Sequence, residues 1–241
     1  MVDGYSIPIS GMRKSPPLDT TAARRSTISD LSDSIWLKAT ALGCRRAGQW
    51  LFRNLDFKCR PGQLIWLRGP NGSGKTSLLR LLAGLSPPDE GQLLTDPEVP
   101  AGFKEKLVYI AHANGLKDDL TALESLDFLA RLHGRPHDPT SLNAALRRLA
   151  IHHRRYAAIR TLSQGQRRRV ALSRLALERQ AGLWVLDEPF DALDIAGIEA
   201  VNGLLREHLA RGGGVIMTSH VPLDLQGLTV LQVDLAGSPA A

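Results

Sequence analysis

The segment from Gly69 to Thr76 restricts the fold of this 241-residue chain more than any other feature. It reads Gly-Pro-Asn-Gly-Ser-Gly-Lys-Thr, which satisfies the pattern G-x-x-x-x-G-K-[ST], and it lies between a predicted strand, Leu64–Arg68, and a predicted helix with leucines from Leu78 to Leu85. Glycines let the backbone form a nest of inward N–H groups, and the start of the helix adds positive potential. The segment therefore predicts a phosphate-binding loop rather than an ordinary glycine-rich turn.

The side chains of this loop indicate which phosphate compound it binds. Lys75 is expected to lie along the β- and γ-phosphates of ATP, and the Thr76 hydroxyl is expected to ligate Mg²⁺. The other predicted nucleotide contacts share this short segment, and they are Gly69, Pro70, Asn71, Gly72, Ser73, Gly74 and Ser77.

A second candidate site lies where a later apolar strand ends in two acids. The strand Leu183–Leu186 is followed by Asp187 and Glu188. This order predicts that Asp187 joins the Mg²⁺ shell and that Glu188 polarises an attacking water. Two acids after a strand also fit the charged start of a helix, and the glycine-rich loop decides in favour of triphosphate hydrolysis.

The rest of the chain predicts an α/β fold with a sheet covered on both faces. Short apolar runs alternate with helical patterns, as in a largely parallel sheet. The predicted strands are Leu107–Ala111, Gly182–Leu186, Gly214–Thr218 and Leu228–Val233, preceded by Ile35–Leu42 and Trp50–Lys58 as an antiparallel entry. Residues from about 113 to 165 show only sequence patterns typical of helices, with predicted helices at Thr121–His133 and Ser141–His152.

Composition narrows the class without choosing a partner. Residues 1–34 are rich in Ser, Pro, Thr and Arg and predict a disordered extension, or equally a mis-assigned start. The formal charge of +6 suits nucleic acid, an anionic membrane surface or nucleotide. Cys44 and Cys59 have neither disulfide-framework nor zinc spacing, and no apolar run approaches the roughly 20 residues of a membrane span. We therefore expect a chain of the reducing cytosol.

The segment Leu162–Gln166 carries a family resemblance. It reads Leu-Ser-Gln-Gly-Gln, ahead of the helical run Arg167–Leu177, and it resembles the LSGGQ signature of ABC (ATP-binding cassette) ATPases. The resemblance implies that Ser163, Gln164, Gly165 and Gln166 contact ATP held by a second copy of the chain. Ala192–Asp194 resembles the family's D-loop, and His220 resembles its switch histidine, which contacts the γ-phosphate.

This resemblance extends from Ile35 to the C-terminus. It implies a P-loop NTPase fold of the ABC type over residues 35–241, with a mostly parallel sheet core, an antiparallel β-subdomain and a helical subdomain. Two positions depart from the family pattern. His112 occupies the position of the Q-loop glutamine, so that metal coordination there would use imidazole or be absent. Arg45 and Arg46 stand where many members stack an aromatic ring on adenine, which leaves an arginine plane or Trp50 as substitutes.

Several stretches further resemble the ATP-binding subunits of the cytochrome c maturation system, often described as haem-exporter ATPases. They are Ala111–Lys117, Leu120–Leu126, Gln164–Arg174, Asp187–Asp194 and Gly212–His220. The resemblance implies a peripheral subunit at the cytoplasmic face of the inner membrane, paired with a second copy and with CcmB/CcmC-like integral subunits. ATP hydrolysis would there release haem-loaded chaperone for attachment to apocytochromes.

Three alternatives remain at this stage. An ATPase for another ABC exporter or importer would share all of this nucleotide chemistry. A soluble ABC protein acting on nucleic acid or ribosomes is disfavoured by the single cassette and the lack of base-stacking aromatics, so no nucleic acid is expected. A non-hydrolysing subunit is disfavoured by the presence of Lys75, Glu188 and His220.

Overall fold

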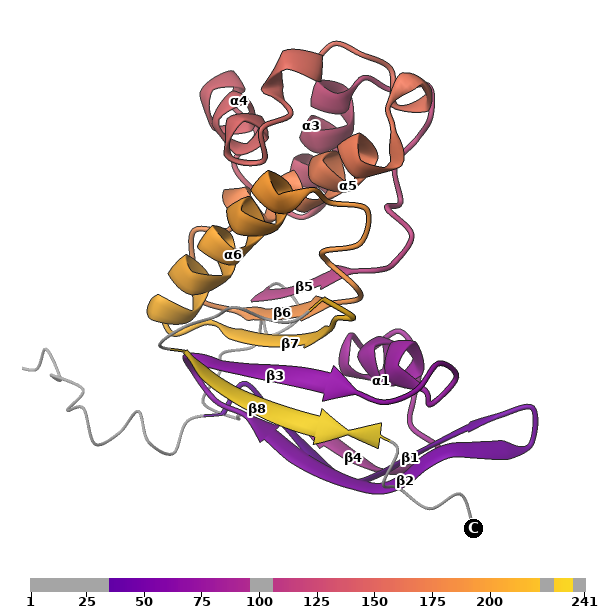
Figure 1. Cartoon of the computed structure of the whole chain (residues 1–241). Coiled ribbons are helices and arrows are strands. Elements are labelled where there is room, and N and C mark those ends of the chain that lie inside the picture. The colour runs from indigo at the N-terminus through magenta and orange to yellow at the C-terminus, as the bar shows by residue number, and fades with distance from the viewer. Residues whose placement is uncertain (1–34, 96–105, 222–227, 236–241) are drawn as a thin grey trace, which may run out of the picture. The chain divides into compact units, whose positions relative to one another are not determined.

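Two sheets organise the part of the chain that the computed structural model describes, namely residues 35–95, 106–221 and 228–235. The larger sheet is parallel, in the order β5-β6-β7-β3-β8, and the smaller is antiparallel, in the order β2-β1-β4 (Figure 1). The strands are β1 (Leu37–Arg46), β2 (Gln49–Cys59), β3 (Gln63–Arg68), β4 (Glu90–Leu94), β5 (Leu107–Ile110), β6 (Leu183–Leu186), β7 (Gly214–Thr218) and β8 (Thr229–Asp234). The predicted fold class is confirmed.

Neighbouring residues of the central strands point into two different hydrophobic cores, because side chains alternate across a sheet. In β6, Trp184 and Leu186 join one core, whereas Leu183 and Val185 join the other. All four side chains are buried. Burial on both faces explains why these strands are unbroken apolar runs rather than alternating patterns.

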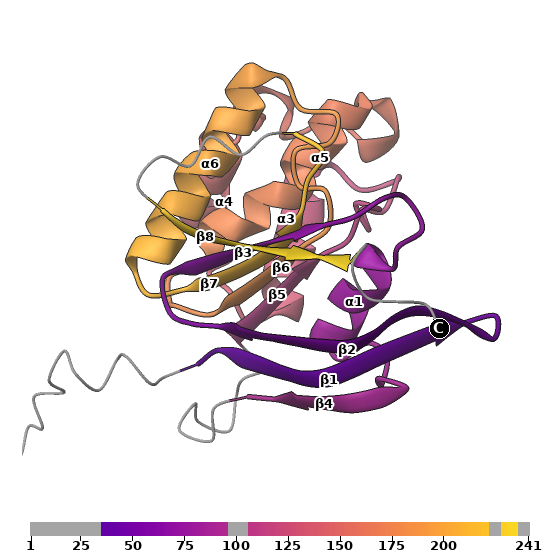
Figure 2. The same cartoon turned by 60° about the horizontal axis from the view of Figure 1, so that its bottom comes forward.

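The helices divide between the two faces of the parallel sheet. Helix α1 (Lys75–Leu82) buries its leucines in the core shared with the antiparallel sheet. The opposite face is covered by α3 (Ala122–Leu132), α4 (Pro139–Arg148), α5 (Gln164–Ser173) and α6 (Ile195–Ala210), with 3₁₀ turns at His152–Arg154, Ile159–Thr161 and Arg174–Leu177. Figure 2 shows α1 near the antiparallel sheet, with α6 on the far side of the parallel one. Consequently α1 packs in the core between the two sheets, and its preceding loop follows the end of β3.

One helix prediction was wrong at both ends. The sequence pattern predicted a helix over Ser141–His152, whereas α4 begins at Pro139 and ends at Arg148. Proline suits the first helical position because its missing N–H would be unpaired there in any case. The Asp138 side chain caps the start by accepting from the Ser141 N–H at 2.9 Å. The proline is thus part of the helix start rather than an interruption.

The edge strand β4 was not predicted, because Glu90–Leu94 is short, contains a glycine and buries none of its residues fully. The predicted disordered extension, residues 1–34, lies outside the described residues. Within the described ranges, no helix combines the length and the apolar character that a bilayer-spanning helix needs.

Candidate nucleotide site

The loop between β3 and α1 has the left-handed backbone that only glycine adopts freely. Gly69 and Gly74 have φ angles of 144° and 94°. A Cβ atom on Gly74 would lie 2.9 Å from the Leu51 Cβ, and one on Gly69 would lie 2.6 Å from the Ser73 Oγ. The Ser73 hydroxyl is buried without a hydrogen-bond partner among the described residues. The loop is therefore a tight cradle with an unused polar group inside it, which fits an oxygen-rich ligand such as a phosphate chain.

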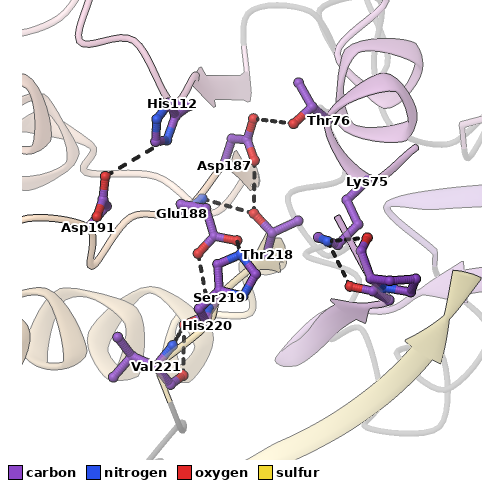
Figure 3. A network of polar contacts seen from close by, with 12 residues as sticks. Lys75, Thr76, His112, Asp187, Glu188, Asp191, Thr218, Ser219, His220 and Val221 are labelled. Carbon is purple, nitrogen blue, oxygen red and sulfur yellow. Dashed lines mark hydrogen bonds and ion pairs between the residues drawn. The ribbon is translucent and has the colours of Figure 1, made fainter. Parts of the chain in front are cut away.

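The Lys75 ammonium lies across this cradle at the start of α1. Its Nζ donates to the Gly69 carbonyl at 2.7 Å and to the Pro70 carbonyl at 3.0 Å (Figure 3). These contacts hold the cation over the loop, next to the positive end of the helix. The role of Lys75 along the phosphates stays a prediction.

Thr76 and Asp187 meet at the same place although they are 111 residues apart. The Thr76 hydroxyl donates to the Asp187 Oδ2 at 2.9 Å. The other carboxylate oxygen, Oδ1, accepts from the Thr218 hydroxyl at 2.9 Å. Asp187 is only 2% exposed, at the end of β6. A hydroxyl and a carboxylate side by side are oxygen donors of the kind that Mg²⁺ binds, so these residues fit the predicted metal.

Glu188 is held in a strained backbone conformation beside Asp187. Its φ angle is 47°, which costs a non-glycine residue about 1–3 kcal/mol and persists only where neighbours enforce it. Its N–H donates to the Thr218 Oγ1 at 2.9 Å, and its Oε2 accepts from the His220 N–H at 3.0 Å. The His220 imidazole Nε2 lies 3.5 Å from the Oε1 of the same carboxylate. Figure 3 shows this chain of contacts running from Thr76 to His220.

These residues line one open cleft with a volume of about 430 Å³. His112 belongs to its wall, and its Nδ1 lies 4.0 Å from the Asp191 Oδ2 across an exposed gap. The full lining is Leu51, Asn71, Gly72, Gly74, Lys75, Thr76, Ser77, His112, Asp187, Glu188 and His220. The structure thus brings the predicted loop, acids and both histidines together, and the metal role of His112 stays a prediction.

The signature residues lie elsewhere, at the start of α5. Ser163 caps the helix by accepting from the Gln166 N–H at 3.3 Å, while the Gln166 side chain accepts from the Ser163 N–H at 3.1 Å. In this arrangement the Ser163 hydroxyl hydrogen is left to donate outward. Neither Ser163 nor Gln164, Gly165 or Gln166 is among the described residues that line the cleft.

The signature start and the predicted D-loop form one edge. A Cβ on Gly165 would lie 2.5 Å from the Ala192 carbonyl oxygen, so that only glycine permits this approach. The Asp194 carboxylate caps α6 by accepting from the Gly197 N–H at 2.8 Å and also pairs with Arg169 of α5. The hydrogen bond from Gly197 is the main reason why the pKa of Asp194 is lowered.

The suggested adenine-stacking residues are already engaged with one another. The guanidinium carbons of Arg45 and Arg53 lie 4.0 Å and 4.3 Å from the centre of the Trp50 ring. The adjacent Leu51, rather than Trp50, lines the cleft. Leu51 was missed by the sequence reasoning, as were Thr218 and the buried Arg168, and the sequence around them carries no signal that marks their contacts.

Comparison with known proteins identifies the family that this chain resembles in sequence. The family model described as "ABC transporter" matches residues 52–191. The "Cytochrome c biogenesis ATP-binding export protein CcmA" of Nitrosomonas europaea is 46% identical over 198 residues, which cover 80% of this chain and 92% of that protein. The protein described as CcmA 2 of Cupriavidus metallidurans is 45% identical over 87% of this chain and 100% of its own length.

Two solved structures share the fold of this chain, and at their low sequence identity they support the fold alone. The "Structure of ATP binding subunit of ABC transporter" superposes with a TM-score of 0.71 at 23% identity, covering 83% of this chain and 87% of the other. A putative ABC transporter ATP-binding protein from Pyrococcus furiosus gives a TM-score of 0.69 at 24% identity, covering 83% of this chain and 96% of the other.

Proposed function

Since the chain belongs to the ABC transporter ATPases and, among them, to the cytochrome c biogenesis ATP-binding export proteins, we propose that the cleft beside Gly69–Thr76 is where it hydrolyses ATP. The observation that carries this proposal is the unbroken set of contacts from Thr76 through Asp187 and Thr218 to Glu188. It links the phosphate cradle to the acid that would activate water. An isolated glycine-rich turn would need no such connection.

The triphosphate would bind along the cradle, with its terminal phosphate near Lys75. The ammonium would exchange the Gly69 and Pro70 carbonyls for phosphate oxygens, which are stronger acceptors because they carry charge. Thr76 and Asp187 would hold Mg²⁺, which neutralises charge that develops on the phosphates. The protein's part at this end of the cleft is to bind and orient.

Glu188 would polarise the attacking water, and His220 would contact the γ-phosphate. The Glu188 carboxylate is 17% exposed and is oriented by the His220 N–H, so that it faces the cleft with restricted freedom. A positioned base of this kind raises the rate of a proton-transfer step by about 10²- to 10⁴-fold. Its strained backbone supports a functional reason for its orientation.

A second copy of the chain would complete each site. Ser163 and Gly165 lie at a helix start that adds positive potential, yet they are not part of the cleft lining formed by the described residues. A head-to-tail pair would bring the signature of one copy to the ATP held by the other. Hydrolysis would then release the pair, and residues 113–165 would transmit this change to membrane subunits.

The cargo side of the proposal rests on the relatives. The names of these relatives assign them to cytochrome c biogenesis. We infer that this chain works at the cytoplasmic face of the inner membrane with CcmB/CcmC-like subunits, in haem delivery to apocytochromes. Purification from membranes and mass spectrometry of the bound proteins tests this, because recovery with integral subunits of an unrelated transporter would contradict it.

The catalytic proposal is tested with Lys75→Ala, which removes the cation from the cradle. We expect loss of hydrolysis and weaker ATP binding, whereas Lys58→Ala, at an exposed lysine of β2, should leave both unchanged. Turnover at the wild-type rate in Lys75→Ala, measured by phosphate release, would refute the assignment.

The pairing is tested with Glu188→Gln, which keeps the shape of the acid but removes its charge. With ATP and Mg²⁺ this variant should scatter light as a particle of two chains. Adding Ser163→Glu should return it to one chain, because a carboxylate would repel the phosphates. A Glu188→Gln protein that pairs equally well with and without Ser163→Glu would contradict pairing through the signature.

A further inference from the structure

Arg168 is a buried cation in α5 that contacts two separate segments of the chain. It is only 3% exposed, although arginine is seldom buried unless its donors are paired. Burial lowers its pKa from the ordinary value, and the nearby Asp191, Asp187 and Glu188 oppose that change. The guanidinium remains charged in any ordinary buffer because the pKa of arginine is so high. Its hydrogen bonds are therefore charge-assisted.

One arm of the guanidinium holds the strained residue of the candidate site. Its Nη2 donates to the Asp187 carbonyl at 2.8 Å and to the Glu188 carbonyl at 2.7 Å. The Glu188 N–H is held from the other side by Thr218. The peptide groups on both sides of the Glu188 Cα are thus fixed, which is what a positive φ at a non-glycine residue requires.

The other arm holds the loop after β5. The Nη1 donates to the Ala111 carbonyl at 2.9 Å, to the Asn114 Oδ1 at 3.1 Å and, more weakly, to the His112 carbonyl at 3.4 Å. One planar group therefore joins the loop that carries His112 to the turn that carries Glu188. A lysine could not do this, because its single ammonium cannot reach both sets of acceptors in the plane of a fork.

We propose that Arg168 is a positioning residue for hydrolysis, which acts by clamping the backbone of Glu188 so that its carboxylate faces the cleft. This inference rests on the proposed role of Glu188 as the group that polarises water. Arg168 is not among the described residues that line the cleft beside the phosphate cradle. Loss of the clamp should therefore affect the chemical step and leave ATP binding nearly intact.

The first test compares Arg168→Met and Arg168→Lys with a control, Arg206→Met, in the full chain. Arg206 lies in α6 and pairs with Glu199 at the surface, and it is not among the described residues that line the cleft. We expect Arg168→Met to lower kcat by at least about 10-fold, a part of what a positioned base contributes, with KM for ATP and the Kd of a fluorescent ATP analogue changed by less than about 3-fold. Arg168→Lys should recover part of the loss, and Arg206→Met should match wild type in kcat.

The second test separates positioning from general damage by a double-mutant cycle. If Arg168 acts only through Glu188, then Arg168→Met should slow a Glu188→Gln enzyme by less than about 2-fold, since the group to be positioned is already gone. Independent losses that multiply in the double variant would overturn the inference. A Kd for nucleotide that rises in parallel with the fall in kcat would overturn it as well.

The outcomes also distinguish this inference from the proposed function. Full activity in Glu188→Gln would remove the role of Glu188 and with it the premise. A strongly slowed Glu188→Gln enzyme beside a fully active Arg168→Met enzyme would contradict the clamp alone. If Arg168→Met does not fold, as judged by its thermal melt, Arg168→Lys carries the test, and a wild-type kcat for that variant contradicts the requirement for a fork.

Discussion

His208 should make the folded protein sensitive to mild acid. It is fully buried in α6 and stacks on Trp184, with ring centres 3.8 Å apart and planes 10° from parallel. Its Nε2 donates to the Gly182 carbonyl at 3.0 Å, and its Nδ1 has no hydrogen-bond partner among the described residues. A second proton would place an unpaired charged N–H in the core. Burial accordingly lowers the pKa of His208 to about 4, opposed by the hydrogen bond to Gly182.

The size of the effect follows from linkage. Because the folded-state pKa lies below the ordinary value of 6.5, the unfolded chain binds the extra proton first as the pH falls. His208 therefore does not lower the free energy of unfolding above about pH 6.5. Below that pH the free energy of unfolding falls, until the folded protein also binds the proton near pH 4. Between pH 7 and pH 5 this one group should lower the free energy of unfolding by about 2 kcal/mol.

The assay compares urea unfolding of the wild type and of His208→Phe at pH 7, 6 and 5. Phenylalanine keeps a ring on Trp184 but cannot titrate, and the Gly182 carbonyl still accepts from the Gly214 N–H at 2.8 Å. Any strain from the larger ring is the same at each pH and cancels in the slope. The variant should lose about 2 kcal/mol less than the wild type between pH 7 and pH 5. Equal losses, within about 0.5 kcal/mol, would refute the argument.

Three other changes test separate parts of the structure. Gly165→Ala should reduce the ATPase rate and separate the helix start from the Ala192 carbonyl, which hydrogen exchange at residues 163–166 would detect; unchanged exchange contradicts the close approach. Thr76→Val should raise the Mg²⁺ concentration needed for half-maximal hydrolysis, while the protein stays folded. An unchanged Mg²⁺ titration would exclude this hydroxyl as a ligand. Asp138→Ala should lower the free energy of unfolding through loss of the α4 cap, measured in urea at pH 7, with Asp138→Asn as the tolerated control.

The local parts of the fold and site were predictable from sequence. The glycine loop, the acids after β6 and the buried strands each have a signal within about ten residues, namely a motif or an apolar run. The strand predicted at Gly214–Thr218 was confirmed in full. The predicted helix began at Ser141, two residues after the first residue of α4, although Asp138 followed by Pro139 is typical of a capped helix start.

The contacts that organise the site could not be predicted, because they join distant segments. Thr218 forms hydrogen bonds with Asp187 and Glu188, about thirty residues away, and nothing in the neighbouring sequence indicates these partners. Arg168 stands among three consecutive arginines, and only the packing of α5 shows which one is buried. Side-chain pairing of this kind depends on tertiary geometry that periodicity does not report.

Alternate side chains of β6 enter different cores, so the direction in which Asp187 and Glu188 leave the strand depends on the number of residues before them. Because successive side chains enter opposite cores, inserting or deleting a single residue within β6 would exchange the two sides for the residues on one side of the change. Asp187 and Glu188 would then leave the strand end facing the wrong layer. Changes in chain length are thus tolerable in the connections, but inside β6 only an even number could preserve both the packing and the direction of the acids.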